Sequence, residues 1–184
     1  MTEGVDLEQA ALQATRHWLD AAVVGLNLCP FAKAPLVKDQ VRIVVNQSRH
    51  ADGWLDQLDS ELDLLVATSA DEIETTLLVH PTLFADSFLD FNDFMEVAEG
   101  IVEEHGLEGV VQLAFFHPLF QFEGTEENAM ENYTNRAPYA TMHLLREDSI
   151  DRAVSSPLDA DTIVQNNIAT LNRLGLAGWK ALGF

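Results

Sequence analysis

Three short apolar runs, separated by two amphipathic segments, constrain the fold of this chain more than any other feature. VRIVV (41–45), TTLLVHP (75–81) and GVVQLAFFHP (109–118) have the length and the β-branched and aromatic content of buried strands. The segments between them have apolar residues at three- and four-residue spacing, which is the pattern of amphipathic helices. Strands that alternate with helices are typical of parallel strand pairs joined by right-handed crossovers.

The two crossover helices have defined faces and ends. The apolar face of the first consists of Trp54, Leu58, Leu62 and Leu65. The second is predicted to begin at Ser87, which with Asp90 fits a capping box, and to stop at Gly106. These signals place a helix between each pair of predicted strands.

Further elements extend the pattern at both ends. A helix is predicted over residues 6–24, capped by Gly25 in the left-handed conformation, and another over residues 161–174. TMHLL (141–145) is a fourth strand, whose direction the pattern leaves open. We therefore expect an α/β layered fold with a small mixed, mostly parallel sheet of about four strands flanked by helices. A permuted ferredoxin-like α+β sandwich is the alternative, because a helix follows the fourth strand.

Length and composition favour a single domain over residues 1–184. The chain has no repeats or linker-like stretches, and its 47% apolar and 22% charged residues are ordinary globular usage. The first residues, MTEGVDLE, lack the basic start and apolar run of a signal peptide. No apolar stretch approaches the roughly 20 residues that span a bilayer. A single cysteine cannot form an internal disulfide, so we expect a soluble cytoplasmic protein.

The charge of the chain argues against two classes of partner. Thirty acidic residues against ten lysines and arginines give a formal net charge of −20. A field of that sign repels phosphate backbones and anionic lipids, so neither nucleic acid nor membrane is an expected partner. The segment from Lys33 to Arg49 breaks this pattern, because it contains four bases and only one acid, Asp39. The only cysteine lies just before it.

Polar residues follow each of the three crossover-linked strands. Asn46 follows the first, and His80 and His117 each precede a proline at the end of the next two. The carboxyl ends of parallel strands share one edge, where open α/β sheets bind ligands. Two imidazoles there can act as general acid and base, bind a metal or donate to an anion. The alternative is that both histidines bond to local backbone.

Cys29, in the loop NLCPFAK, has three interpretations. Nearby basic residues lower a thiol pKa, and an imidazole from His80 or His117 would complete a nucleophile–base pair. The same three residues form the weak alternative of a metal site. A free cysteine is also among the residues most often buried as a small apolar side chain. The preceding helix end, with its carbonyl groups, favours this last interpretation.

The segment between the third and fourth strands is long and polar. Connections of this length in a compact domain are often functional. Its candidate ligand-binding residues are Gln121, Tyr133, Asn135, Arg136 and Tyr139. Arg136 is the only lysine or arginine between Arg49 and Arg146, so it either clamps a substrate carboxylate or phosphate, or fixes the loop.

Other patterns are weaker or absent. His143 would point to the opposite face from its neighbours Met142 and Leu144, toward a site or toward solvent. DFNDF (90–94) lacks the glycine and acid that a calcium loop needs, so its acids suit a helix start. No nucleotide-binding, zinc-protease or nucleophile-elbow motif is present, and the sequence names no cofactor.

Several motifs together resemble a known family. GLNLCPFAK, TTLLVHP, the FNDF helix, FHPLFQFEG and NYTNRAPYATMHLLRE are similar to an uncharacterised bacterial family, the domain of unknown function 1415. The resemblance covers nearly the whole chain. The matching positions are Cys29, Pro30, His80, Pro81, His117, Pro118, Gln121, Tyr133, Asn135, Arg136, Pro138 and Tyr139. The resemblance supports this set of residues and implies no mechanism.

Two functional hypotheses follow. The first is an enzyme acting on a small polar or anionic molecule, with catalytic Cys29, His80 and His117. Asn46 and the loop residues would bind the substrate. The second is a non-catalytic binding or assembly protein that uses the polar loop 117–139 and the tail GLAGWKALGF, including as a homo-oligomer. The first predicts that Cys29 and the two histidines converge; the second predicts that the histidines diverge.

Overall fold

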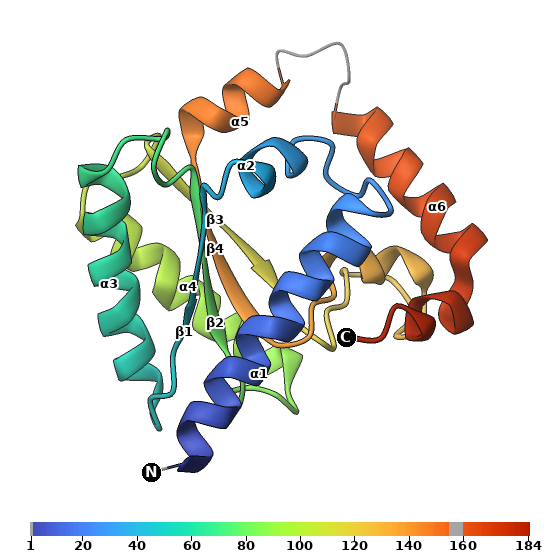
Figure 1. Ribbon diagram of the computed structural model, residues 1–184, viewed down its shortest axis with the longest axis horizontal. Helices are drawn as coiled ribbons and strands as arrows, with labels where there is room; N and C mark the ends of the chain where they lie inside the picture. The colour runs from blue at the N-terminus through green and yellow to red at the C-terminus, as the bar shows by residue number, and fades with distance from the viewer. Residues whose placement is uncertain (1, 155–159) are drawn as a thin grey trace.

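The centre of the molecule is a four-stranded sheet with the strand order β1-β2-β4-β3 (Figure 1). The structure is a computed structural model and describes residues 2–154 and 160–184. The strands are β1 (Val41–Val45), β2 (Thr75–His80), β3 (Val111–Phe116) and β4 (Ala140–Arg146). Each predicted strand is present, and the predicted mixed sheet of an α/β fold is confirmed.

The fourth strand is inserted between two strands that share a direction. β1 pairs in parallel with β2, whereas β4 is antiparallel to both β2 and β3. β1, β2 and β3 therefore all point the same way, although only one adjacent pair is parallel. As a consequence, the residues that end these three strands lie at one edge of the sheet.

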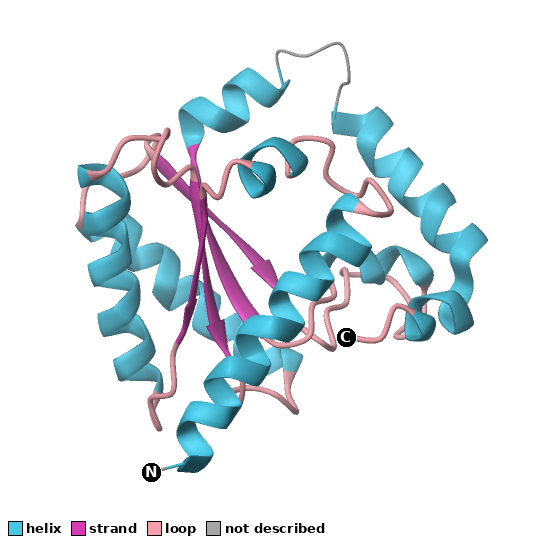
Figure 2. Cartoon of the chain, viewed as in Figure 1, coloured by secondary structure: helices cyan, strands magenta, loops and turns pink. Residues whose placement is uncertain are grey.

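Helices cover both faces of the sheet (Figure 2). α3 (Ala51–Ala67) and α4 (Phe88–Glu104) pack on one face. The other face is covered by α1 (Thr2–Trp18), its π-helical extension η1 (Leu19–Val24), the short α2 (Lys33–Val37) and α6 (Ala160–Ala181). α5 (Glu147–Val154) follows β4, and the 3-10 helix η2 (Met130–Asn135) lies in the long polar segment.

Alternation along the strands creates two cores. In β2, Leu78 joins the core under α3 and α4, and Leu77 and Val79 join the core under α1 and α6. Successive strand residues point to opposite faces, so one strand supplies both cores. The predicted inward residues of α3, from Trp54 to Leu65, are fully buried. Each buried leucine of this kind contributes about 1.5–3 kcal/mol of transfer free energy.

The end of the first helix differs from the sequence-based prediction. Gly25 has φ −62°, in the right-handed region, and the left-handed residue is Asn27, with φ 55°. The helix widens into a π turn before it ends, which delays the change of hand by two residues. Glycine is required for another reason: a Cβ at position 25 would clash with the Ala21 carbonyl oxygen.

The signals for α4 agree with the structure, and the last helix is longer than predicted. The Ser87 Oγ accepts a hydrogen bond from the Asp90 N–H at 3.2 Å, and Gly106 has φ 63° beyond the helix end. α6 passes Leu174 but breaks at Gly175, whose φ of 66° and ψ of 171° are accessible only to glycine. The chain after this break turns toward η2.

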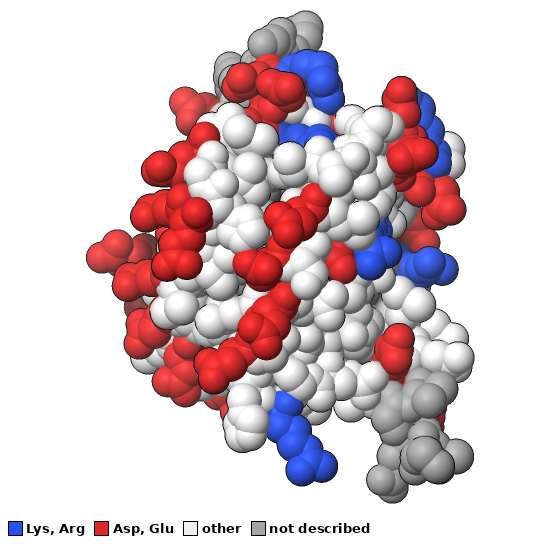
Figure 3. Space-filling view, turned by 90° about the vertical axis from the view of Figure 1, so that its left-hand side faces the viewer, with Lys and Arg blue, Asp and Glu red and all other residues white. Residues whose placement is uncertain are grey.

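The surface reflects the excess of acidic residues. On the side that carries α3, carboxylates form broad bands, and lysines and arginines are few (Figure 3). In the part of the chain that the structure describes, no helix combines the length and the apolar character needed to cross a membrane.

Candidate functional site

His80 ends β2 and joins three backbone segments. Its Nε2–H donates to the Ser48 carbonyl at 3.0 Å, and its Nδ1 accepts from the N–H groups of Thr82 and Leu83 at 3.3 and 3.0 Å. Because an amide N–H can only donate, the ring proton must be on Nε2. The ring packs against the Trp54 indole at a centroid distance of 5.0 Å. His80 thus ties β2 to the loops on either side of it.

His117 makes the same arrangement beyond the end of β3. Its Nε2–H donates to the Phe84 carbonyl at 2.8 Å, and its Nδ1 accepts from the Leu119 N–H at 3.0 Å. The ring is fully buried and stacks on Phe91 at 5.1 Å. Burial lowers the pKa of both His80 and His117, so both rings are neutral at pH 7.

The strand-end histidines therefore lie at one edge of the sheet but serve different loops. β4 separates them, because His80 pairs with Ala140 of β4 and Phe116, next to His117, pairs with Thr141. Both nitrogens of each ring are occupied by backbone groups. This geometry is the one expected of histidines that bond to local backbone. An acid–base role for either remains a prediction.

Asn46 supports the same edge. Its Oδ1 accepts from the Ser48 N–H at 2.8 Å and its Nδ2 donates to the Gly53 carbonyl at 3.1 Å. The side chain is buried, and the Ser48 carbonyl in turn accepts from His80. Asn46 thus shapes the turn between β1 and α3.

Arg136 holds the long polar segment together. Its Nε donates to the Phe120 carbonyl at 3.2 Å and its Nη2 to the Glu127 carbonyl at 2.7 Å. The guanidinium lies 4.1 Å from the centre of the Tyr133 ring, a cation–π geometry. Arg136 is only 9% exposed. The alternative in which Arg136 fixes the loop fits these contacts, which are to backbone carbonyls.

The remaining loop candidates have similar structural contacts. Gln121 and Asn135 each donate a side-chain amide to a backbone carbonyl, at 2.6 and 3.3 Å. Tyr139 packs at the border of the core under α1 and α6. Asn132 makes four hydrogen bonds within the segment while fully buried. Asn132 is outside the predicted ligand-binding set, although a loop asparagine is a common internal cap.

Cys29 lies over the opposite face of the sheet from His80 and His117. It is half-buried in the loop between η1 and α2. Burial raises the pKa of its thiol, and hydrogen bonds from the backbone of Phe31 and Ala32 offset this only in part. The thiol is therefore protonated at neutral pH, and the nearby lysines do not activate it.

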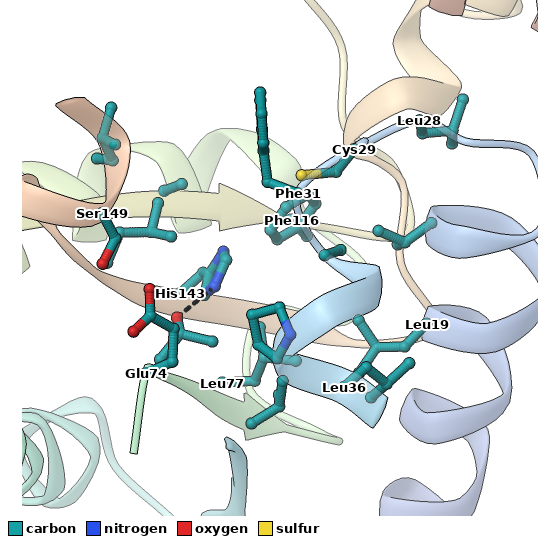
Figure 4. Close-up of a pocket in the computed structure, with 18 of the residues that line it drawn as sticks. Leu19, Leu28, Cys29, Phe31, Leu36, Glu74, Leu77, Phe116, His143 and Ser149 are labelled. Carbon is teal, nitrogen blue, oxygen red and sulfur yellow. Dashed lines mark hydrogen bonds between the residues drawn. The ribbon is translucent and has the colours of Figure 1, made fainter. Parts of the chain in front are cut away.

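Cys29 lines a cavity of about 390 Å³ between the sheet and α1, α2 and α5 (Figure 4). Most of the lining is apolar; its larger members are Trp18, Leu19, Leu28, Phe31, Leu36, Leu77 and Phe116. The polar members are few and include Thr75, His143 and, toward α5, Glu74, Arg146 and Ser149. An apolar cavity of this size with a few polar groups is the usual form of a small-molecule site.

His143 is the central polar group of the cavity. Its Nε2 lies 2.7 Å from the Thr75 Oγ1, which donates its own proton to the Leu144 carbonyl at 2.6 Å. Since the hydroxyl proton is already used, Nε2 must carry the imidazole proton and donate it to Thr75. Nδ1 receives no hydrogen bond from any described residue. Burial lowers the pKa of His143 from 6.5 to about 4.

Glu74 and Ser149 form the polar end of the cavity. Arg152 donates to the Ser149 Oγ at 2.8 Å and approaches the Glu74 carboxylate at 3.5 Å. Figure 4 shows Glu74, Ser149 and His143 toward this end, with Cys29 beside Phe31 and Phe116. The cavity is thus apolar at the loop that carries Cys29 and polar near α5.

The structure therefore brings together a different set of residues from the predicted one. Cys29 shares its cavity with His143, while His80 and His117 face the other core. Within residues 2–154 and 160–184, no three histidine, cysteine, aspartate or glutamate side chains are close enough to hold a metal ion. The alternation of β4 indicates that His143 faces the cavity, but the cavity itself depends on α2 and α5, which the sequence did not predict.

Comparisons with known proteins identify a family and no function. The chain has no significant match among the curated proteins, and none among the solved structures. One family profile, described as a protein of unknown function (DUF1415), matches residues 10–181. Because this match covers nearly the whole chain and includes both the cavity and the strand-end residues, the chain belongs to the DUF1415 family.

Proposed function

We propose that this chain is a small-molecule-binding protein. Its ligand is compact and largely apolar, and it places one hydrogen-bond donor, such as a hydroxyl or amine, against Nδ1 of His143. The observation on which the proposal depends is the state of that ring: neutral, fixed by Thr75 in one tautomer, and left with an unpartnered acceptor in an apolar cavity.

The cavity supports this ligand class by its size and lining. About 390 Å³ holds a molecule with a single ring or a short branched chain. The apolar walls contribute free energy in proportion to the apolar area that the ligand removes from water. A polar acceptor in such a cavity is costly unless it is paired, so a ligand that supplies a donor is favoured over one that does not.

The charge of the ligand follows from the same groups. A neutral imidazole nitrogen with a lone pair repels an anion. The two charged side chains of the lining, Glu74 and Arg146, are of opposite sign, and Glu74 also pairs with Arg152. We therefore propose a neutral ligand for this cavity. This proposal keeps the small-molecule ligand of the first sequence-based hypothesis, but its body is apolar rather than polar, and an anion is not expected here.

Catalysis in the same cavity is a second candidate function. It is favoured by one observation: a thiol and a neutral imidazole, Cys29 and His143, line the same space. The raised pKa of Cys29 opposes it, because a protonated thiol is a poor nucleophile. The catalytic group of Cys29, His80 and His117 and the substrate contacts of the polar loop likewise remain proposals. Labelling of Cys29 by iodoacetamide between pH 6 and pH 10 tests the thiol directly.

Two matched probes test the binding proposal. Benzyl alcohol and ethylbenzene have nearly the same shape, but only the alcohol has a donor. We expect His143→Leu to reduce the ratio of the two affinities, alcohol over hydrocarbon, by about five- to tenfold, the size of one buried hydrogen bond. The exposed His50→Leu is the matched control and leaves the ratio unchanged. Equal ratios in the wild type and in His143→Leu would contradict the proposal.

A further inference from the structure

A second hollow, of about 370 Å³, lies between the polar segment and the end of α6. It is separate from the cavity that contains His143, because the two share no lining residue. Its walls include Tyr133 and Pro138 of the polar segment and Trp179 of α6. Arg136 and Lys180 line it as well.

The break in α6 builds this hollow. The backbone at Gly175 turns the last part of the helix toward η2, and the Trp179 ring then meets the Tyr133 ring edge to face at 5.2 Å. Phe184 contacts Trp179 at 5.3 Å and completes the wall. The tail is thus packed within the chain, and the space it leaves is aromatic.

The charges of the lining side chains are of one sign. Arg136 and Lys180 are cations, and none of the lining side chains is acidic. No described carboxylate forms an ion pair with either residue, although the chain has thirty acidic residues. The charged side chains that line the hollow are thus opposite in sign to most of the surface around it.

Arg136 has donors to spare in this position. Two of its N–H groups reach backbone carbonyls, and described residues take none of the other three. A guanidinium that is nine-tenths buried normally has a carboxylate or another anion as its partner. The charge of Arg136 also acts on a neighbouring residue: together with burial, which is the larger cause, it lowers the pKa of His117.

From these contacts we infer that the hollow binds a small organic anion. The anion is a carboxylate with an aromatic or flat apolar body. Its carboxylate accepts from the free N–H groups of Arg136 and is attracted by Lys180. Its body contacts Trp179 and Tyr133, which favour flat apolar groups. The anionic ligand expected from the sequence would then bind outside the cavity of His143.

Benzoate titrated by calorimetry at low salt tests this inference. Lys180 is exposed, so Lys180→Gln removes its charge without disturbing the core, and we expect benzoate binding to weaken about threefold. Lys38→Gln removes an exposed charge outside the hollow and leaves binding unchanged. Arg136→Lys keeps the charge but loses the planar fork, and weakens binding about tenfold. Acetate, which lacks the ring, binds more weakly than benzoate.

The outcomes that overturn the inference are specific. They are the absence of saturable benzoate binding, or equal weakening by Lys180→Gln and Lys38→Gln. Equal affinities for benzoate and acetate would contradict the proposed contact of the ligand's flat body with Trp179 and Tyr133. The inference does not depend on the proposed function, and His143→Leu separates the two: it leaves benzoate binding unchanged, just as Lys180→Gln leaves the preference for benzyl alcohol unchanged.

Discussion

Histidines lie on both faces of the sheet, but the partners of their ring nitrogens differ between the two faces. On the face under α3 and α4, His80 and His117 are buried, and backbone groups occupy both nitrogens of each ring. On the other face, His143 has the same Nε2–H tautomer, but its Nδ1 faces a cavity without a partner among the described residues. Burial lowers the pKa in all three. The partner of one nitrogen therefore distinguishes a structural histidine from a candidate ligand-binding one.

Because backbone groups occupy both nitrogens of His80 and His117, substitutions of these two residues should have the largest effects on stability. His80→Leu leaves the Ser48 carbonyl and the N–H groups of Thr82 and Leu83 without partners, and should lower the free energy of unfolding by about 2–4 kcal/mol. His117→Leu should have a similar effect. His143→Leu should cost less than about 1 kcal/mol, because it breaks one hydrogen bond and removes an unpaired acceptor. Urea unfolding at pH 7 measures all three. A His143→Leu protein as unstable as His80→Leu would break the comparison.

The pH dependence of the free energy of unfolding tests whether His143 is held neutral in its cavity. His143 has a lower pKa in the folded chain, about 4 against 6.5, so the unfolded state binds its proton first as the pH falls. Its contribution to stability is complete above about pH 6.5 and is lost as the pH falls to about 4. Between pH 7 and pH 4 the wild type should lose about 2–3 kcal/mol more than His143→Leu. His80 and His117 titrate in the same direction in both proteins, so they cancel. Parallel curves for the two proteins would mean that His143 is not held neutral.

Thr75 gives a subtler test of the same face. Thr75→Val removes the oxygen that accepts from Nε2–H and lets the imidazole proton move to Nδ1. The cavity then presents a donor where it had an acceptor. Benzyl alcohol does not report this change, because its hydroxyl can accept as well as donate. Acetophenone can only accept, so we expect its affinity relative to ethylbenzene to rise about fivefold in Thr75→Val, with the walls unchanged. Thr68→Val, in the turn after α3 and outside the cavity, is the control. An unchanged preference for acetophenone over ethylbenzene in Thr75→Val would show that the tautomer does not matter.

The smallest effect concerns the thiol. Because burial raises the pKa of Cys29, iodoacetamide should label the folded protein more slowly than the unfolded chain at pH 7. Occupation of the cavity by benzyl alcohol should slow labelling a further twofold or so, because Cys29 lines the same space. Intact-mass spectrometry measures this labelling without ambiguity, because the chain has one cysteine. Faster labelling in the folded state would restore the activated thiol of the enzyme hypothesis.

Local patterns in the sequence predicted the helices and strands of the fold but not the order of the strands in the sheet. The spacing of Trp54, Leu58 and Leu62 indicated the buried face of α3, and Ser87 and Gly106 marked the ends of α4. The position of β4 between β2 and β3 depends on which pairings bury the most apolar surface, and no local pattern reports that. The three strand ends were therefore correctly placed at one edge, while the strand that separates His80 from His117 was not foreseen.

The candidate site was less predictable for a related reason. Whether a histidine is structural depends on where distant carbonyls lie, as with the Phe84 carbonyl, which accepts from His117. Likewise, the alternation of β4 put His143 opposite Met142 and Leu144. Only the packing of α2 and α5 makes that side a cavity rather than a surface.

Two-bond ¹H–¹⁵N correlation spectra of the histidine rings test the central claim most directly. At pH 7, His80, His117 and His143 should all show a protonated Nε2 and an unprotonated Nδ1. Addition of benzyl alcohol should shift the Nδ1 signal of His143 and leave those of His80 and His117 in place, since peptide N–H groups already occupy them. A charged His143 at pH 7, or an Nδ1 signal that does not respond, would contradict the account.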